Sequence, residues 1–395
     1  MKKKIEILAP AGDIERAKIA FLYGADAIYI GGKEYSLRAN ALNFSLEEIK
    51  EICDYAHNLK KKVYVTFNIL FHNKDLKGYD DYLTELEKAN VDAVIIADPF
   101  LIPVIKEKHK SLKIFLSTQN STSNLESVKY WLSEGVDRIV LAREVSKKEI
   151  KEIYDATGAE LEVFIHGAMC TNFSGRCVLS NYFTNRDANR GGCAQVCRYA
   201  FTIPNNKEKF CISPKDLIMA KHIKELIECG VTSLKIEGRM RSIYYLATVI
   251  SCYRRIVDAY YKNTLDQELL DKEIKVLKRV ANRESSSHFF NKRATYRDQY
   301  YIDREEVSNQ DFLAIVTDYD KENKILTLEQ RNYFKVGDEV TLFGPNSFED
   351  SFKIKAIYDE DLNPLDCARH PQQKIKIKYK KNVAVNSMLR VNIFK

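Results

Sequence analysis

The sequence predicts an α/β fold: a (β/α)8 TIM-like barrel with a cysteine-rich insertion after strand 7 and a small C-terminal all-β domain. Three observations support this prediction. Eight short apolar runs alternate with amphipathic segments through the first 240 residues. A similar turn precedes every second run, and the last interval between these turns is about 50 residues longer than the one before, which indicates an insertion. From about residue 300 the chain changes to short apolar runs broken by turn residues, as in β-strands.

The eight apolar runs are rich in Val, Ile, Leu and Phe, and most of them barely alternate. Strands that are buried on both faces of a parallel sheet have this composition. A doubly wound open sheet would show the same alternation with helices. The count of eight and the recurring turn favour the closed barrel. The predicted strands cover residues 5–12, 27–32, 62–68, 93–98, 113–119, 138–144, 161–167 and 233–239.

Amphipathic segments separate the predicted strands, for example at residues 45–60 and 79–90. Residues 241–285 are also predicted to be helical. We therefore expect one domain over residues 1–299, which holds the barrel, an insertion at about residues 168–212 and trailing helices. Residues 300–395 are expected to form a small β-barrel-like domain.

A basic strand stands out in this second domain. The chain has a net charge of +7, and residues 371–395 alone carry +7, without any Asp or Glu. Within them, lysine alternates with Ile or Tyr, the period of a half-buried strand with one basic face. The strand could be a solvated edge strand, where lysine blocks unwanted pairing, or a face that contacts phosphates. Its candidate phosphate-binding residues are Lys374, Lys376, Lys378 and Lys380.

Four cysteines lie within 28 residues, with the spacing C-x6-C-x15-C-x3-C: Cys170, Cys177, Cys193 and Cys197. Clustered cysteines in a reducing compartment more often bind metals than form disulfides. Iron–sulfur clusters are commonly held by four thiolates. Structural zinc sites usually use closely paired cysteines, and only the last two have such a spacing. The spacing favours a cluster and leaves zinc or unliganded thiols open.

The N-terminal segment is basic but has no long apolar run and no small-residue cleavage site. No stretch approaches 18 consecutive apolar residues, so we expect no transmembrane helix. With nine cysteines and no sign of secretion, a disulfide framework is not expected. The expected location is the cytoplasm.

Polar side chains follow nearly all the predicted strands, at the end of a barrel where active sites lie. Each alone would also fit a cap or a loop hydrogen bond, but together they predict a polar pocket, near which Lys235 and Arg241 add positive charge. His166 and Glu237 are candidates for proton transfer, chosen by position only. Guanidinium groups at such a rim suit carboxylate or phosphate ligands. The candidates for substrate binding are Arg38, Asn68, Gln119, Arg143 and Arg239.

Several motifs together resemble those of the U32 peptidase family. The similarity covers essentially the whole barrel, and the cysteine block is its specific part. The last 85 residues are a weaker match, similar to the small β domain that follows the barrel in several members. The motifs are LAPAG, GADAIYIGG with the following YSLRA, HGAMC with SGRCVLS, NRGGCAQVCR, and SPKDL with LKIEGRMRS.

The resemblance implies a 4Fe-4S cluster. The family's ligand set maps onto Cys170, Cys177, Cys193 and Cys197. Some members take one ligand from elsewhere in the chain, which makes Cys211 and Cys229 the spare candidates. Handling in air could leave such a site empty or filled with zinc.

The resemblance also implies an activity. Better-understood members take part in oxygen-independent or prephenate-dependent hydroxylation of the tRNA wobble uridine, of a ribosomal RNA cytidine, or of the ubiquinone ring. The tRNA branch fits best, because a basic strand in the C-terminal domain could hold RNA phosphates. The leading hypothesis is iron–sulfur-dependent 5-hydroxylation of the tRNA wobble uridine, with prephenate as the candidate co-substrate. Its candidate dicarboxylate ligands are Arg38, Arg143 and Arg239.

Three alternatives stay open. The first is a U32-type, collagenase-like peptidase, although the sequence has no G-x-S-x-G elbow and no H-E-x-x-H motif. The second is a non-catalytic, RNA-binding scaffold with an iron–sulfur cluster or zinc. The third is a hydroxylase component of quinone biosynthesis. The expected partners are tRNA, a small dicarboxylate and a paralogous U32 protein, without membrane or DNA.

Overall fold

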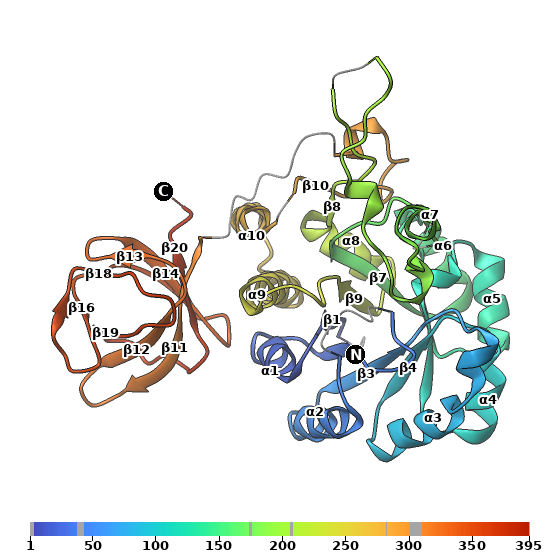
Figure 1. Cartoon of the computed structure of the whole chain (residues 1–395), viewed down its shortest axis with the longest axis horizontal. Coiled ribbons are helices and arrows are strands. Elements are labelled where there is room, and N and C mark those ends of the chain that lie inside the picture. The colour runs from blue at the N-terminus through green and yellow to red at the C-terminus, as the bar shows by residue number, and fades with distance from the viewer. Residues whose placement is uncertain are drawn as a thin grey trace.

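The computed structural model describes residues 4–37, 43–173, 176–205, 208–281, 283–300 and 310–394. Figure 1 shows two parts, a barrel wrapped by helices and a smaller β domain that lies beside the helices α9 and α10. In barrels of this kind the active site lies at the C-terminal ends of the strands.

Eight parallel strands close into a barrel, in which each strand pairs with the next and the last pairs with both β7 and β1. The predicted (β/α)8 barrel is confirmed, and each predicted strand coincides with an observed one. The strands are β1 (Glu6–Pro10), β2 (Ala27–Gly31), β3 (Lys62–Phe67), β4 (Ala93–Ile96), β5 (Lys113–Leu116), β6 (Arg138–Val140), β7 (Glu160–Gly167) and β9 (Ser233–Ile236). Two short strands that we did not predict, β8 (Asp216–Ile218) and β10 (Ser285–Ser286), extend the sheet beyond β7.

Helices with clear start signals cover the outside of the barrel. Ser45 and Ser146 each begin a helix with a reciprocal capping box, formed with Glu48 and Glu149 respectively. Among the described residues, no helix is both long and apolar enough to cross a membrane. The helices are α1 (Ile14–Leu22), α2 (Leu46–Asn58), α3 (Tyr79–Lys88), α4 (Leu101–Lys108), α5 (Leu125–Ser133), α6 (Lys147–Thr157), α7 (Leu179–Thr184), α8 (Ile223–Glu228), α9 (Ile243–Tyr261) and α10 (Gln267–Val280).

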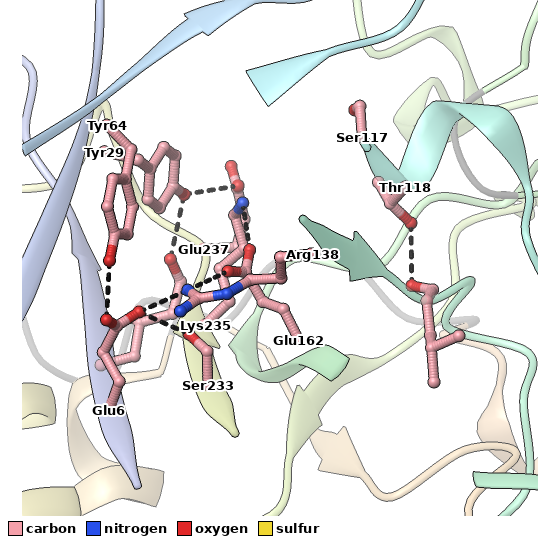
Figure 2. A network of polar contacts seen from close by, with 12 residues as sticks. Glu6, Tyr29, Tyr64, Ser117, Thr118, Arg138, Glu162, Ser233, Lys235 and Glu237 are labelled. Carbon is pink, nitrogen blue, oxygen red and sulfur yellow. Dashed lines mark hydrogen bonds and ion pairs between the residues drawn. The ribbon is translucent and has the colours of Figure 1, made fainter. Parts of the chain in front are cut away.

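A network of ion pairs lies inside the barrel (Figure 2). Arg138 Nη1 lies 2.6 Å from Glu6 Oε1 and 3.2 Å from Glu162 Oε2, and Lys235 Nζ lies 2.7 Å from Glu162 Oε1. Burial alone would raise the pKa of Glu162, but Lys235 and Arg138 hold it below its usual value. The network therefore stays charged and fixes four strands, β1, β6, β7 and β9, to one another from the inside.

The C-terminal domain is all-β, as predicted. Its eight-stranded antiparallel sheet has the order β15-β14-β20-β11-β12-β19-β16-β17, and β13 pairs separately with β18. The predicted boundary between residues 299 and 300 stays a prediction, because residues 301–309 lie outside the described part of the chain. The strands are β11 (Phe312–Asp320), β12 (Ile325–Gln330), β13 (Phe334–Lys335), β14 (Glu339–Phe343), β15 (Glu349–Lys353), β16 (Ile357–Tyr358), β17 (Pro364–Leu365), β18 (Cys367–Ala368), β19 (Lys374–Lys378) and β20 (Met388–Val391).

The basic strand is β19, and it has the predicted two-residue period. Ile375 and Ile377 are buried in the domain core, whereas Lys374 and Lys378 are exposed. The interpretation as an edge strand is wrong, because β19 lies between β12 and β16 in the sheet. The lysines therefore form part of a face of the sheet and do not guard its edge.

The barrel and the β domain share an apolar and ionic interface. Tyr23 of α1 donates a hydrogen bond to the Asn386 carbonyl oxygen at 2.8 Å, and Tyr244 of α9 stacks on Phe312 with a 5.1 Å centroid separation. Glu349 of the β domain lies 3.1 Å from the ammonium group of Lys272 on α10. Burial raises the pKa of Glu349, but nearby cations outweigh it and lower the pKa below 4.5.

We predict that Glu349→Gln lowers the free energy of unfolding by about 1–3 kcal/mol near neutral pH, because buried cations then lose their carboxylate. A carboxylate whose pKa is lowered in the folded state contributes stability above pH 4.5 and loses this contribution as the pH falls through its folded-state pKa. Urea unfolding of both proteins should therefore show a difference that shrinks below pH 4.5. A difference that is independent of pH would contradict the ionic role.

Candidate functional site

A cavity of about 1390 Å³ opens at the C-terminal ends of the barrel strands. Its floor is built by side chains from inside the barrel, Tyr29 on β2, Phe164 on β7 and Lys235 on β9. Its rim is built by the segments that follow β3, β5, β6 and β9, and by the insertion after β7. The cavity is larger than most pockets for one small molecule, which measure roughly 300–1000 Å³.

The insertion between β7 and β8 is held against the rim by polar contacts. Arg190 makes a bidentate ion pair with Asp75, at 2.6 and 2.8 Å, and Arg176 Nε donates to the Gln119 carbonyl oxygen at 3.0 Å. At its start, Gly167 has a φ of +104°, and a Cβ there would collide with the Glu237 carbonyl oxygen. Glycine is therefore required where the insertion leaves the barrel.

The four clustered cysteines line this cavity. Burial raises the pKa of Cys197 to about 11, against the effect of Arg198, and the thiols of Cys170, Cys193 and Cys177 add to the increase. Burial also raises the pKa of Cys170, while Arg143 opposes the increase. Cys170 and Cys197 are thus each influenced by other cysteines of the set and by one guanidinium group that lines the same cavity.

The four cysteine thiols are donors of the kind that bind metals. Among the described residues, no three His, Cys, Asp or Glu side chains converge to hold one metal ion. A single zinc ion needs such convergence, since each Zn–S bond is about 2.3 Å long. In a four-iron cluster each thiolate binds a different iron, so the thiolates need not meet at one point. The four thiols line one cavity with Arg143 and Arg198, and thiolates are the donors that a polynuclear iron–sulfur cluster takes.

The two spare cysteines are placed differently. Cys211 also lines the cavity, where its thiol donates to the Tyr300 carbonyl oxygen at 2.8 Å. Cys229 is buried at the end of α8, with its sulfur 3.8 Å from the Lys147 carbonyl oxygen, and does not line the cavity. Of the two, only Cys211 is within the site.

Arg143 is one of the cations in the cavity wall. Its guanidinium carbon lies 3.8 Å from the centroid of the Phe164 ring, which holds the group flat against an aromatic face. Its Nε is buried and has no hydrogen-bond partner among the described residues. A buried donor without a partner is costly, so an anion or carbonyl ligand at this position would be stabilised.

The other predicted substrate-binding residues hold the rim together. Arg239 is 3% exposed and donates from Nη1 to Ser36 at 3.1 Å and to Thr66 at 3.2 Å. Asn68 accepts from the Leu37 amide at 3.2 Å, and Gln119 accepts from the Ser117 hydroxyl at 3.3 Å. All three line the cavity. Arg38, the fifth predicted residue, lies outside the described residues.

The two candidates for proton transfer are separated by the structure. Glu237 lines the cavity, and its Oε2 accepts a hydrogen bond from the Tyr29 hydroxyl at 3.2 Å. His166 does not line the cavity: its Nδ1 lies 3.2 Å from the Tyr253 hydroxyl on α9. Burial, assisted by Arg241, lowers the pKa of His166 to about 3, so the ring is neutral at physiological pH.

A β-bulge explains why His166 turns away. In a regular strand His166 would share a face with Phe164, which lines the cavity. The register between β7 and β9 shifts between these two residues, and a bulge of this kind redirects the side chains that follow it. Sequence periodicity has no signal for such a shift. Sequence reasoning missed Tyr29. Because side chains alternate along β2, Tyr29 shares a face with Gly31 at the strand end, and this alternation could have identified it.

Comparison with known proteins gives two family matches and several related proteins. Residues 12–300 match the model of peptidase family U32, and residues 308–390 match that of the peptidase family U32 C-terminal domain. The chain is 45% identical to "tRNA hydroxylation protein P1" of Bacillus subtilis (strain 168), over 98% of this chain and 95% of that protein. It is 33% identical to "tRNA hydroxylation protein P" of Escherichia coli (strain K12), over 87% and 86%. It is also 32% identical to "Collagenase" of Porphyromonas gingivalis (strain ATCC BAA-308 / W83), over 70% and 71%.

Proposed function

The chain belongs to peptidase family U32, and from this premise we propose that it hydroxylates RNA, with the wobble uridine of tRNA as its target. The observation that carries the proposal is the 45% identity, over nearly the full length of both chains, to a relative named for tRNA hydroxylation. The relative named collagenase is less similar and is covered less completely. tRNA is then the partner, and the cytoplasm is the expected location. A paralogous U32 partner stays a prediction.

The cavity supports this proposal by its size and position. A base must leave its stack to reach a pocket at the end of a barrel. A volume of about 1390 Å³ has room for a nucleotide together with a second small molecule. A hydroxylation that uses an organic oxygen donor needs both at once.

The proposed cofactor is a 4Fe-4S cluster held by Cys170, Cys177, Cys193 and Cys197. When bound, such a cluster supplies one-electron redox chemistry. Arg143 and Arg198 would offset part of the negative charge that four thiolates bring to the cavity, since they oppose the rise in thiol pKa that burial causes at Cys170 and Cys197.

Two groups in the cavity are suited to the substrates. The Arg143 guanidinium, with a buried donor and an aromatic face behind it, would bind a carboxylate of a co-substrate such as prephenate. The Glu237 carboxylate, which accepts from the Tyr29 hydroxyl, would take a proton from the base or deliver one to it. Arg239 would act as a positioning residue, because its side chain fixes Ser36 and Thr66 at the rim.

The lysines of β19 remain the candidates for contact with RNA phosphates. Lys374 and Lys378 are exposed on one face of β19 while Ile375 and Ile377 pack inward, and Lys380, which follows the strand, is also exposed. Exposed lysines on one face add to binding through counterion release, which makes affinity depend on salt.

We predict that Arg143→Gln weakens the binding of prephenate about 10- to 100-fold, because hydrogen bonds to charged groups contribute about 1.5–3 kcal/mol. Calorimetry on protein purified without oxygen measures this affinity. Arg186→Gln is the matched control, since Arg186 is exposed on the insertion and does not line the cavity. Equal affinities for wild type and Arg143→Gln would contradict the assignment of Arg143 to the carboxylate.

Deletion of the gene tests the proposed function directly. The 5-hydroxyuridine derivative in bulk tRNA, measured by mass spectrometry of nucleosides, should disappear in the deletion strain and return with the wild-type gene. Unchanged tRNA in the deletion strain would remove the proposal. Robust peptide cleavage by protein stripped of metal would favour the peptidase hypothesis in its place.

A further inference from the structure

Aromatic side chains gather on the insertion at the mouth of the cavity. We call Phe183, Tyr199, Phe201 and Phe210 the aromatic rim. Phe183 on α7 is 58% exposed and Tyr199 is 43% exposed, although both are large and apolar. The ring centroids of Phe183 and Phe201 are 6.0 Å apart, as are those of Phe201 and Phe210. Figure 1 shows that this part of the chain extends beyond the end of the barrel, away from its helical layer.

The aromatic rim is continuous with the cavity. Tyr199 and Phe210 line the cavity as well as the surface, together with Lys209. A backbone bridge between Phe201 and Phe210 holds the two sides of this segment together, with hydrogen bonds of 2.8 and 3.0 Å. A ligand that extends out of the cavity would therefore cross these rings.

The charge around the aromatic rim has one dominant sign. Between Cys170 and Ile212 the sequence has only two acidic residues, Asp187 and Glu208. Arg198 is exposed and lies next to Tyr199 in the chain, and it lines the cavity together with Lys209. The basic residues of this stretch that the structure describes are Arg176, Arg186, Arg190, Arg198 and Lys209. Exposed aromatic rings among cations are the combination that binds single-stranded nucleic acids, where rings stack on bases and cations hold phosphates.

We propose that the aromatic rim stacks the unpaired bases on either side of the target nucleotide and so holds the RNA loop over the cavity. The proposal rests on the proposed function, since it requires an RNA substrate. It adds a binding surface on the barrel, separate from the lysines of β19. Stacking is tolerant of sequence, because every base has a π face, so the rim recognises an unpaired loop and not a particular base.

The experiment measures binding of a fluorescein-labelled RNA hairpin with an unpaired loop, by anisotropy, to the full-length protein purified without oxygen. Phe183→Ala and Tyr199→Ala should each weaken binding roughly 5- to 100-fold, the effect of losing one stacked base. Tyr199→Phe should bind as wild type, because stacking needs the ring and not the hydroxyl. Arg198→Gln should lower the slope of log affinity against log salt by about 0.7, as expected for one lost phosphate contact on a single strand.

The matched control is Tyr130→Ala. Tyr130 is 54% exposed on α5, away from the insertion, and its loss should leave RNA affinity unchanged. Iron content and the thermal unfolding midpoint of each variant show that fold and cofactor are intact. An RNA duplex of the same length should bind more weakly than the hairpin and should not respond to Phe183→Ala.

Three outcomes would overturn the proposal. The first is wild-type affinity in both alanine variants, the second is an equal loss for hairpin and duplex, and the third is no binding of the hairpin by the wild-type protein. If Phe183→Ala alters the oligomeric state and leaves RNA affinity unchanged, the rim is a protein interface instead. Each result is independent of whether the deletion strain loses hydroxylated tRNA, so the aromatic rim and the proposed function can fail separately.

Discussion

Cys170→Ala should abolish tRNA hydroxylation when it replaces the wild-type gene in a deletion strain. Cys170 is one of four thiols that line the same cavity, and two of the others, Cys177 and Cys193, add to the rise in its pKa. Loss of one thiolate from a four-cysteine set leaves one iron without its protein ligand, which removes or disables a cluster. Nucleoside mass spectrometry of bulk tRNA gives the hydroxylated fraction, and iron and sulfide analysis of the purified variant gives the cluster content.

The matched control is Cys53→Ala, which also removes one thiol. Cys53 is buried in α2 on the outer layer of the barrel and does not line the cavity. It should restore hydroxylation and retain iron, with a modest loss of stability from the missing sulfur. Full activity of Cys170→Ala with normal iron content would show that the cysteine set is not the cofactor site.

Arg138→Met should lower the free energy of unfolding of the barrel by about 3–5 kcal/mol, the usual cost of breaking a buried ion pair. Arg138 is 2% exposed and lies between the carboxylates of Glu6 and Glu162. Without it, Glu6 and Glu160 lose their guanidinium partner, and Glu162 keeps only the ammonium group of Lys235 (Figure 2). Urea unfolding followed by circular dichroism measures the change. The free energy of unfolding of the variant should also fall more at alkaline than at mildly acidic pH.

Two further variants separate charge from packing. In Arg138→Met with Glu6→Gln, one uncompensated charge is removed, while the amide oxygen can still accept from the Tyr64 hydroxyl, now 2.7 Å from Glu6. This double variant should recover part of the lost stability. Lys151→Met breaks an exposed pair with Asp155, both side chains being 55% exposed, and should change the stability by less than about 0.5 kcal/mol. If the double variant is no more stable than Arg138→Met, lost packing and not charge explains the effect.

The sequence predicted the fold well because burial leaves a direct record in composition. Each barrel strand is covered on both sides, so its residues are mostly apolar, and all eight such runs became strands of the barrel. The alternation of lysine and isoleucine in β19 likewise predicted a strand with one buried face. Its place inside the sheet was missed, because pairing partners depend on segments far away in the chain, here β12 and β16.

The candidate site was predicted in part. Strand ends identified Glu237, Arg143 and Asn68, which all line the cavity, because parallel strands bring their C-terminal ends together. The same rule failed for His166, since a single extra residue in β7 turned its side chain towards α9. It also could not separate Arg143, whose guanidinium packs against the Phe164 ring, from Arg239, which is engaged with Ser36 and Thr66.

The sequence by itself determined the barrel, the β domain and the existence of a cysteine-rich insertion, because these depend on local composition and spacing. Only the tertiary structure decided which side chains share the cavity. It brought the four cysteines together with Arg143 and Tyr29, and it exposed the aromatic rim beside them. Tyr29 lies more than 100 residues before the other groups in the chain, so their meeting depends on barrel closure, while a bulge in β7 turns His166 away from them. Neither of these leaves a periodic signal in the chain, because both are set by pairing between distant strands.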